Sequence, residues 1–207
     1  MLKFKNKFIV IEGAIGVGKT SLVLKLSNRF NARHNLEVVE ENPFLLKFYN
    51  DIERYAFQTQ IFFLLSRYKQ QVELAQLDLF NQLIFSDYLF AKDRIFAHIN
   101  LSGSELSMYE KLYAIMSKNI PKPDLIIYLQ ANTELLMKRI ALRDRPFERE
   151  ISYGYMTKLN ETYEDFFSYP DNYQRIKLVK INTNDLDFVG KKEDLEYVIS
   201  KIFNGDE

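Results

Sequence analysis

The sequence predicts an α/β domain with a five-stranded parallel sheet and helices on both of its faces. Three observations support this fold class. Short apolar runs, typical of buried strands, recur along the chain and alternate with helical stretches. Polar residues follow the first three runs, namely Glu12 and a glycine-rich turn after the first, Glu40-Glu41-Asn42 after the second and Asp87 after the third. Such alternation is typical of a parallel sheet flanked by helices.

The predicted strands are Phe8–Ile11, Leu36–Val39, Leu83–Ser86, Leu125–Leu129 and Leu178–Ile181. Two helices are also predicted, over Ser21–Phe30 and Lys191–Phe203. Ligands of such sheets bind beyond the carboxyl ends of the strands. We therefore expect the functional site where the polar residues follow the first three strands.

Length and composition limit the classes of protein. The 207 residues contain no linker, repeat or low-complexity tract, so residues 1–207 are interpreted as one domain. The 28 Lys and Arg residues balance 28 Asp and Glu, whereas a dedicated nucleic-acid binder is normally basic. No apolar run approaches the ~18 residues that a membrane span needs. The lack of cysteine excludes disulfides and thiolate metal sites and fits a cytoplasmic protein.

The glycine-rich turn is the most informative motif. It consists of Gly13, Ala14, Ile15, Gly16, Val17, Gly18, Lys19 and Thr20, and it fits the pattern G-x-x-x-x-G-K-[ST] between a predicted strand and a predicted helix. Its backbone N–H groups and the helix N-terminus would cradle phosphates. Lys19 would reach the β- and γ-phosphates, and the Thr20 hydroxyl would hold Mg²⁺. A chance glycine turn is the alternative, but the strand and helix favour a site for a nucleoside triphosphate.

Gln60 and Arg67 lie on one face of a predicted helix that is apolar almost all round. Their separation of seven residues is nearly two helical turns. Because such a helix is buried on more than one side, both polar side chains need partners. A nucleobase could supply them, since an amide both donates and accepts hydrogen bonds. Alternatively, Arg67 pairs with a carboxylate such as Asp93 and supports the pocket indirectly.

Arg139, Arg143 and Arg145 form a second group of interest. Arg139 and Arg143 share one helical face, and Arg145 follows in an Asp-Arg-Pro-Phe turn. Guanidinium groups bind phosphate oxygens bidentately, and a mobile cap that carries them would also exclude water. The alternative is a solvated basic helix end that interacts with the helix dipole.

Five segments together carry a family resemblance that covers nearly the whole chain. They are the glycine loop and residues 37–45, 58–67, 86–97 and 143–148. In this order they resemble the deoxyribonucleoside kinases, and within these the bacterial deoxyguanosine/deoxyadenosine kinase branch. The resemblance implies a P-loop kinase fold with an arginine lid, usually dimeric, that acts in nucleotide salvage. The implied reaction transfers the γ-phosphate of ATP, with Mg²⁺, to the 5′-hydroxyl of a deoxyribonucleoside.

The resemblance also implies roles for single residues. Nucleoside contacts are implied for Glu37, Tyr49, Gln60, Arg67, Asp87, Asp93 and Glu148, and catalytic roles for Lys19, Glu37, Arg143 and Arg145. The donor nucleotide would contact the glycine loop, Arg139 and Arg143. Asp87 follows the third predicted strand, where a carboxylate can bind Mg²⁺ together with Thr20, directly or through water. Glu148 and Tyr49 match the pair that meets the sugar 3′-hydroxyl in the family.

Glu37 is expected to be the base that takes the proton of the 5′-hydroxyl. The family has a Glu-Pro-Val turn here, and this chain has Glu37-Val-Val without the proline. A carboxylate with an ordinary pKa near ~4.3 is ionised at pH 7 and can accept a proton. The alternative is an exposed carboxylate on a strand. Glu40 is three residues away, so on an extended strand the two carboxylates would point to opposite faces.

Two departures from the family pattern leave questions open. Tyr88 stands where the family usually has an arginine near the 5′-oxygen, so the cation that orients this oxygen is not identified. The base is also open: the branch favours a purine, but Gln60 could serve deoxycytidine as well. The glycine loop is also compatible with two other activities. A thymidylate-type monophosphate kinase would need additional cations for the phosphate of its acceptor, and a regulatory NTPase would not need a polar pocket.

Overall fold

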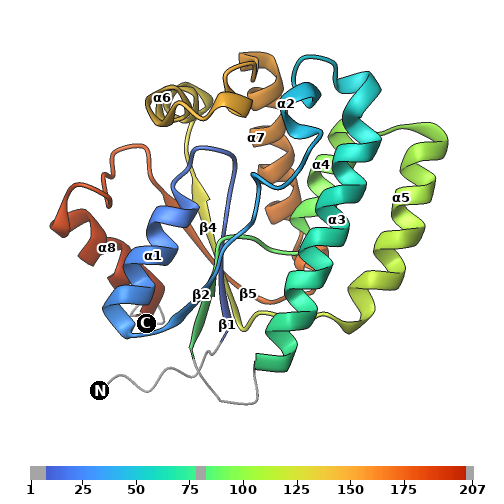
Figure 1. Cartoon of the computed structure of the whole chain (residues 1–207). Helices are drawn as coiled ribbons and strands as arrows, with labels where there is room; N and C mark the ends of the chain where they lie inside the picture. The colour runs from blue at the N-terminus through green and yellow to red at the C-terminus, as the bar shows by residue number, and fades with distance from the viewer. Residues whose placement is uncertain (1–7, 78–82, 204–207) are drawn as a thin grey trace.

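A parallel five-stranded sheet forms the centre of the computed structural model, which describes residues 8–77 and 83–203 (Figure 1). The strands are β1 (Phe8–Glu12), β2 (Arg33–Asn35), β3 (Ile84–Ser86), β4 (Leu125–Gln130) and β5 (Lys177–Asn182), in the order β2-β3-β1-β4-β5. All neighbouring strands are parallel. The fold class predicted from the sequence is therefore confirmed.

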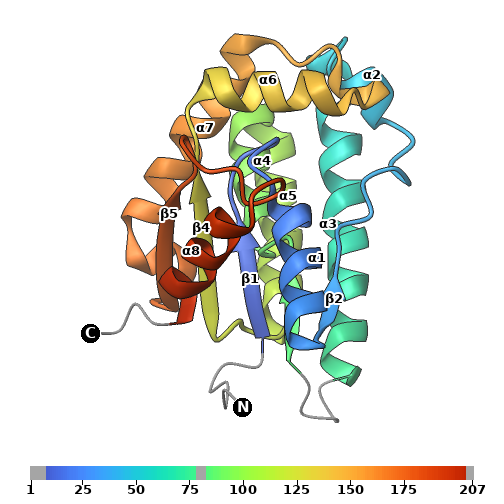
Figure 2. The ribbon, with the colours of Figure 1, turned by 90° about the vertical axis from the view of Figure 1, so that its left-hand side faces the viewer.

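Helices cover both faces of the sheet (Figure 2). On one face lie α1 (Lys19–Phe30) and α8 (Lys192–Phe203), and on the other lie α3 (Ile52–Leu77), α4 (Lys92–Asn100), α5 (Gly103–Met116) and α7 (Tyr153–Ser168). The short α2 (Leu45–Phe48) and α6 (Thr133–Arg143) cross above the carboxyl ends of the strands. This is the edge at which a parallel sheet binds its ligands.

Two apolar clusters hold these layers together. The larger one surrounds β1 and β4, whose apolar residues are buried because helices cover both faces of the sheet. The smaller one lies among α2, α3, α4 and α5. Tyr49 and Tyr155 pack against both clusters and so join them. Among the described residues, no helix combines the length and apolar character that crossing a membrane would require.

The second strand lies earlier in the chain than predicted. Residues 36–39 are irregular, and the strand is Arg33–Asn35 instead. The partner strand β3 ends at Ser86, opposite Asn35, so the next residues have no strand to pair with. Their backbone groups bond to side chains: the Leu36 carbonyl accepts from Gln70, and the Glu37 N–H donates to Asp87. The apolar run Leu36–Val39 forms part of a cavity wall and not a strand.

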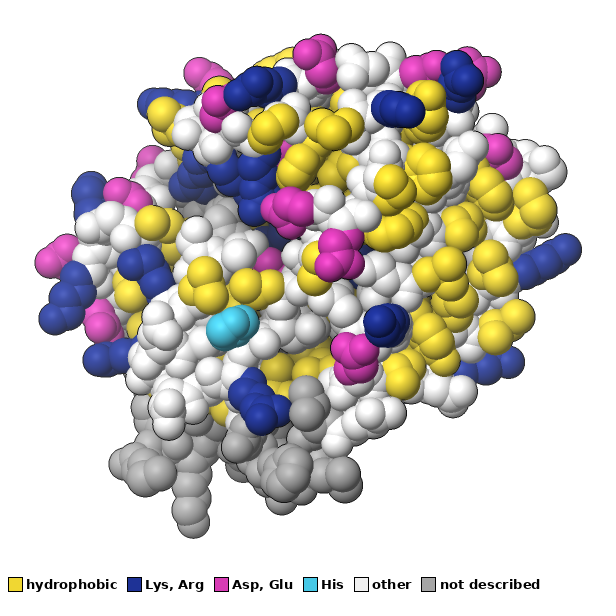
Figure 3. Space-filling view, in the orientation of Figure 1, with side chains coloured by type: hydrophobic (Ala, Val, Ile, Leu, Met, Phe, Trp, Pro, Cys, Tyr) yellow, Lys and Arg dark blue, Asp and Glu magenta, His cyan; other side chains and the backbone are white. Residues whose placement is uncertain are grey.

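One side of the molecule is markedly apolar. Figure 3 shows hydrophobic side chains gathered over α3 and α5. Four large apolar residues on these helices are exposed, namely Leu65, Met108, Leu112 and Ile115. Contiguous apolar surface on a globular protein commonly marks a contact with another molecule.

Candidate active site

The glycine loop turns tightly between β1 and α1. Gly13 has a φ of +148°, and a Cβ atom there would lie 2.4 Å from the carbonyl oxygen of Leu129. At Gly18, φ is +105°, and a Cβ atom would lie 2.7 Å from Cζ of Phe188. Only glycine suits these two positions, because both the backbone conformation and the space exclude a side chain. The Nζ atom of Lys19 lies inside the loop, 2.7 Å from the carbonyl oxygen of Gly13.

Glu12 fastens this loop to the segment after β3. Its Oε1 atom accepts the N–H of Gly13 at 2.9 Å, and its Oε2 atom accepts the N–H of Leu89 at 2.7 Å. The hydroxyl of Tyr163 donates to Oε1 at 3.2 Å. Burial raises the pKa of this fully enclosed carboxyl group. No role was predicted for Glu12, although an acidic residue at the end of an apolar strand is a signal for a buried hydrogen-bonded carboxyl group.

Thr20 and Asp87 meet above the sheet. The Thr20 hydroxyl donates to Oδ2 of Asp87 at 2.5 Å, and Oδ1 of Asp87 accepts the N–H of Glu37 at 2.8 Å. Burial raises the pKa of Asp87. A hydroxyl and a carboxylate oxygen are ligands of the kind that Mg²⁺ takes beside substrate phosphates. The two residues therefore fit the predicted metal site.

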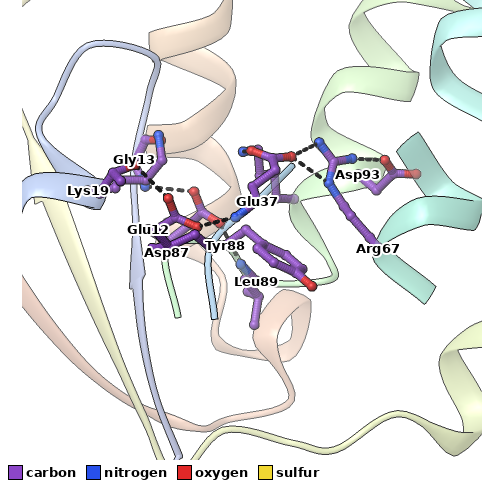
Figure 4. Close-up of polar contacts among 12 residues, drawn as sticks. Glu12, Gly13, Lys19, Glu37, Arg67, Asp87, Tyr88, Leu89 and Asp93 are labelled. Carbon is purple, nitrogen blue, oxygen red and sulfur yellow. Dashed lines mark hydrogen bonds and ion pairs between the residues drawn. The ribbon is translucent and has the colours of Figure 1, made fainter. Parts of the chain in front are cut away.

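Glu37 contacts two buried cations, Arg67 and Lys92. Figure 4 shows the guanidinium of Arg67 directed at its carboxylate. Its Oε1 atom accepts hydrogen bonds from Nε of Arg67 at 2.8 Å and from Nη2 of the same guanidinium, and its Oε2 atom accepts from Nζ of Lys92 at 2.6 Å. Burial by itself raises the pKa of Glu37, but Arg67 and Lys92 outweigh it and hold the pKa well below its usual range. Glu37 is thus an ionised carboxylate inside the cavity.

Arg67 joins this carboxylate to a second one. Its Nη1 atom pairs with Oδ1 of Asp93, and the hydroxyl of Tyr109 donates to Oδ2 of Asp93 at 2.8 Å. The predicted pair of Arg67 and Asp93 is present, and Arg67 contacts Glu37 in addition. Asp93 lies behind Arg67 and does not line the cavity.

Gln60 differs from Arg67 because part of its side chain has no partner. The residue is 2% exposed, and among the described residues nothing bonds to its Nε2 atom. The Oγ1 atom of the neighbouring Thr59 is likewise buried without a described partner. Both residues line a cavity of about 270 Å³. Buried donors without partners are costly, so their position on a cavity wall points to a polar ligand.

The predicted lid arginines have different surroundings. Nη2 of Arg143 donates to both carboxylate oxygens of Glu148, at 2.6 and 2.7 Å. Arg145 lies 3.6 Å from the carboxylate of Glu40, whose side chain is 62% exposed. Both arginines line the cavity of Gln60, together with Glu148.

Arg139 is bound to backbone instead of facing that cavity. Its guanidinium donates to the carbonyl oxygens of Val17 at 3.3 Å, Thr183 at 3.2 Å and Leu186 at 3.2 Å. It borders a second cavity of about 400 Å³, between the glycine loop, α6 and residues 186–189. Arg139 and Arg143 share a helix as predicted, but in this structure only Arg143 borders both cavities.

Tyr49 and Glu148 line the same cavity as predicted for a sugar-binding pair. Burial raises the pKa of the Tyr49 hydroxyl well above its ordinary value, and the nearby Tyr155 and Glu148 add to the effect. The hydroxyl therefore stays protonated and can donate a hydrogen bond. Glu148 is buried and can accept one.

Most of the predicted site residues converge on one cavity. Those that line it are Ile15, Gly16, Lys19, Thr20, Glu37, Tyr49, Gln60, Arg67, Asp87, Arg143, Arg145 and Glu148. Thr59 and Lys92 also line the cavity but were not predicted as site residues. Lys92 directly precedes Asp93 in a segment that carries the family resemblance, but its contact with Glu37 joins residues far apart in the sequence.

A glycine loop after β1, an acid after β3 and arginines after β4 define a P-loop phosphotransferase with a separate acceptor pocket. The chain belongs to the deoxynucleoside kinase family, whose sequence profile matches residues 9–205. The class of enzyme expected from the sequence is confirmed, and the chain is an enzyme that phosphorylates a deoxynucleoside.

Two curated relatives and one solved structure illustrate the similarity. The deoxyguanosine kinase of Bacillus subtilis (strain 168) is 37% identical over 197 residues, which cover 94% of this chain and 95% of the relative. The deoxyadenosine/deoxycytidine kinase of the same organism is 29% identical, over 96% of this chain and 92% of its own length. The structure of deoxyadenosine kinase from M. mycoides with bound dATP has a TM-score of 0.82 at 27% identity, and covers 94% of this chain and 98% of that one.

Proposed function

We propose that the chain transfers the γ-phosphate of ATP to the 5′-hydroxyl of a purine deoxynucleoside, deoxyguanosine or deoxyadenosine. The observation that carries this proposal is the buried Nε2 atom of Gln60, which has no partner among the described residues and lines the acceptor cavity. Both purines offer hydrogen-bond acceptors on their edges, for example N7. Relatives named deoxyguanosine kinase and deoxyadenosine kinase support the choice of a purine.

The residues around the cavity suit each part of phosphoryl transfer. The 5′-oxygen attacks the γ-phosphorus, its proton passes to Glu37, and the bond from the γ-phosphorus to the β–γ bridging oxygen breaks, releasing ADP. When ATP binds, the Nζ atom of Lys19 would exchange its hydrogen bonds to the loop carbonyls for contacts with the β- and γ-phosphates. Arg143 and Arg145 line the same cavity, where they would meet the charge of the migrating group.

Mg²⁺ would be held by Thr20 and Asp87, where it would neutralise charge on the β- and γ-phosphate oxygens. The direct contact between the Thr20 hydroxyl and the Asp87 carboxylate supports this placement. The two residues come from different elements, α1 and the segment after β3. Binding of the metal would therefore also hold these elements together.

The low pKa of Glu37 is compatible with a role as base. A strongly stabilised carboxylate is a weak proton acceptor, but a loose phosphoryl-transfer transition state demands little basicity and mainly requires positioning. Arg67 and Lys92 provide that positioning, because each holds one oxygen of the carboxylate. Glu40 is exposed and lacks comparable support.

The charges of the cavity favour a nucleoside acceptor over a nucleoside monophosphate. Each lysine or arginine among the described residues that line it already has a proposed role: Lys19, Arg143 and Arg145 toward the phosphates of ATP, and Arg67 and Lys92 at Glu37. None of these described cations is left over to form a binding site for a second phosphate on the acceptor. The family match supports the same choice.

A homodimer is a further part of the proposal. The apolar surface on α3 and α5, with Leu65, Met108, Leu112 and Ile115, would be covered by the same surface of a second copy. We expect Ile115→Glu to yield monomers in light scattering, while Leu24→Glu, an exposed apolar residue on α1, leaves the assembly unchanged. A wild-type monomer at micromolar concentration would contradict this part.

A cytoplasmic location stays a prediction from the sequence.

The decisive experiment measures ADP release with ATP, Mg²⁺ and each natural deoxynucleoside, ribonucleoside and deoxynucleoside monophosphate. We expect the highest kcat/KM with deoxyguanosine or deoxyadenosine. The highest kcat/KM with thymidine would refute the purine preference. Turnover with monophosphates only would refute the nucleoside acceptor.

A further inference from the structure

Lys92 is a buried cation at a position where both the helix dipole and the loss of hydration disfavour a positive charge. It is the first residue of α4, and its side chain is 6% exposed. A positive charge at a helix N-terminus opposes the helix dipole, and burial removes its hydration. Neither effect stabilises the fold. A conflict of this kind between local preference and structure is expected at functional positions.

The hydrogen bonds of Lys92 leave part of its capacity unused. Its ammonium group has three N–H donors. Among the described residues, the one hydrogen-bond acceptor of Nζ is Oε2 of Glu37, at 2.6 Å. Lys92 also lines the cavity between the glycine loop and Gln60. Two donors are therefore available for a ligand in that cavity.

Arg67 provides the contrast. Its Nε and Nη2 atoms bond to Glu37, and its Nη1 atom pairs with Asp93. The guanidinium thus contacts one carboxylate on each side and acts on the reaction through Glu37. Of the two cations on Glu37, Lys92 is the one with donors to spare.

The charges near Lys92 show which ligand it suits. Lys92 is close enough to Lys19 to repel it: after burial, this repulsion is the largest cause that lowers the pKa of Lys19 to about 8. The two lysines line the same cavity, and Lys92 contacts Glu37 there. An anion that forms between them would relieve the repulsion and bind both.

We propose that Lys92 is a catalytic residue whose ammonium group contacts the acceptor oxygen while Glu37 takes the proton from it. This inference rests on the proposed function. As the 5′-oxygen loses its proton, it gains negative charge next to a donor that Glu37 already holds in place. The remaining N–H group is available for an oxygen of the migrating phosphoryl group. Lys92 thereby provides the cation that Tyr88, a fully buried neutral residue, does not.

The first test compares Lys92→Met with Lys201→Met, a matched substitution of an exposed lysine on α8. We expect Lys92→Met to lower kcat on the order of 100-fold, as for the loss of one transition-state donor. Nucleoside affinity, measured by calorimetry, should change far less, because the contact strengthens only as charge develops. Lys201→Met should match the wild type. An unchanged kcat in Lys92→Met would overturn the proposal.

Chemical rescue separates the charge from the shape of the side chain. The chain contains no cysteine, so Lys92→Cys introduces a single thiol. Alkylation with 2-bromoethylamine displaces bromide and gives an aminoethyl thioether close to lysine in length, whereas iodoacetamide gives a neutral amide. We expect only the ammonium form to regain kcat, by tenfold or more over the unmodified variant, on the order of one transition-state contact. Equal activity of the two adducts would overturn the proposal.

The outcomes also separate this inference from the proposed function. If the wild type phosphorylates no deoxynucleoside, both fail. If the wild type is active and the Lys92 variants keep its kcat, only the role of Lys92 fails. Should Lys92→Met not fold, the two alkylated forms of Lys92→Cys decide, because they differ in charge at nearly equal size.

Discussion

Gln60 and Arg67 lie on the same helix and line the same cavity, but only Arg67 has its hydrogen bonds satisfied within the chain. Arg67 bonds to Glu37 and Asp93, whereas the Nε2 atom of Gln60 has no partner among residues 8–77 and 83–203. The helix thus carries one polar residue that holds two carboxylates of the site, and another whose N–H₂ group is available to a ligand.

Gln60→Leu should therefore weaken nucleoside binding with little effect on stability. The change removes an amide that has no described partner for its N–H₂ group, so the fold loses little. The lost contact with the base should cost about 1–3 kcal/mol, seen as a lower kcat/KM for the preferred purine. Steady-state kinetics and thermal unfolding check both parts. A kcat/KM equal to that of the wild type would show that Gln60 does not contact the base.

Glu37→Gln should lower kcat by about 10²–10⁴-fold, because the amide keeps the size but cannot take the proton. Glu40→Gln is the matched comparison, and we expect it to lower kcat far less, because Glu40 is exposed and lacks the two cations that hold Glu37. Steady-state kinetics and nucleoside binding should be measured for both variants. An inactive Glu40→Gln beside an active Glu37→Gln would show that the base is assigned to the wrong residue.

Arg143→Ala and Arg145→Ala should each lower kcat by about 10²–10³-fold, since each removes a cation from the cavity in which the phosphoryl group would be transferred. Arg149→Ala serves as the control, because Arg149 pairs with Asp144 in solvent and does not line the cavity. Rapid-quench measurement of the chemical step would separate transfer from product release. If both variants keep the wild-type rate, these arginines are an exposed basic helix end.

Glu37 should make the stability of the protein depend on pH in the acid range. Its pKa in the folded chain lies below the value of about 4.3 expected in the unfolded chain. The folded state therefore holds its proton less tightly, and the stabilisation is fully present above that value and is lost as the pH falls toward the folded pKa. Denaturant unfolding from pH 6 to pH 3 should show a shallower loss of stability for Glu37→Gln than for the wild type. Parallel curves would contradict the depressed pKa.

The fold could be predicted from local patterns because the central strands are apolar and buried on both faces. β1 and β4 are continuous apolar runs, and helical spacing was enough to place Gln60 and Arg67 on one face of α3. The strand at Leu36–Val39 was wrong because its apolar residues face a cavity that sequence periodicity does not show. The expectation that Glu37 and Glu40 differ by strand alternation fails with that strand. Their difference in burial has another origin, the cations around Glu37.

Two features of the site needed the three-dimensional structure. Lys92 contacts a carboxylate 55 positions away in the sequence, and Glu12 accepts the N–H of a residue 77 positions away. No local pattern connects such residues. The backbone contacts of Arg139 are equally hidden, because a carbonyl acceptor leaves no trace in residue identity.

The bonds of Arg139 to Val17, Thr183 and Leu186 determine where a closing motion can start. They anchor the middle of α6 to two loops next to the sheet, whereas Arg143, Arg145 and Glu148 all follow that anchor. If these residues form the predicted lid, we expect its pivot to lie after Arg139, and its moving part to be the end of α6 and the short helix that follows. Closure over the nucleoside would thus be a small local movement, in which the glycine loop and the loop after β5 keep their positions.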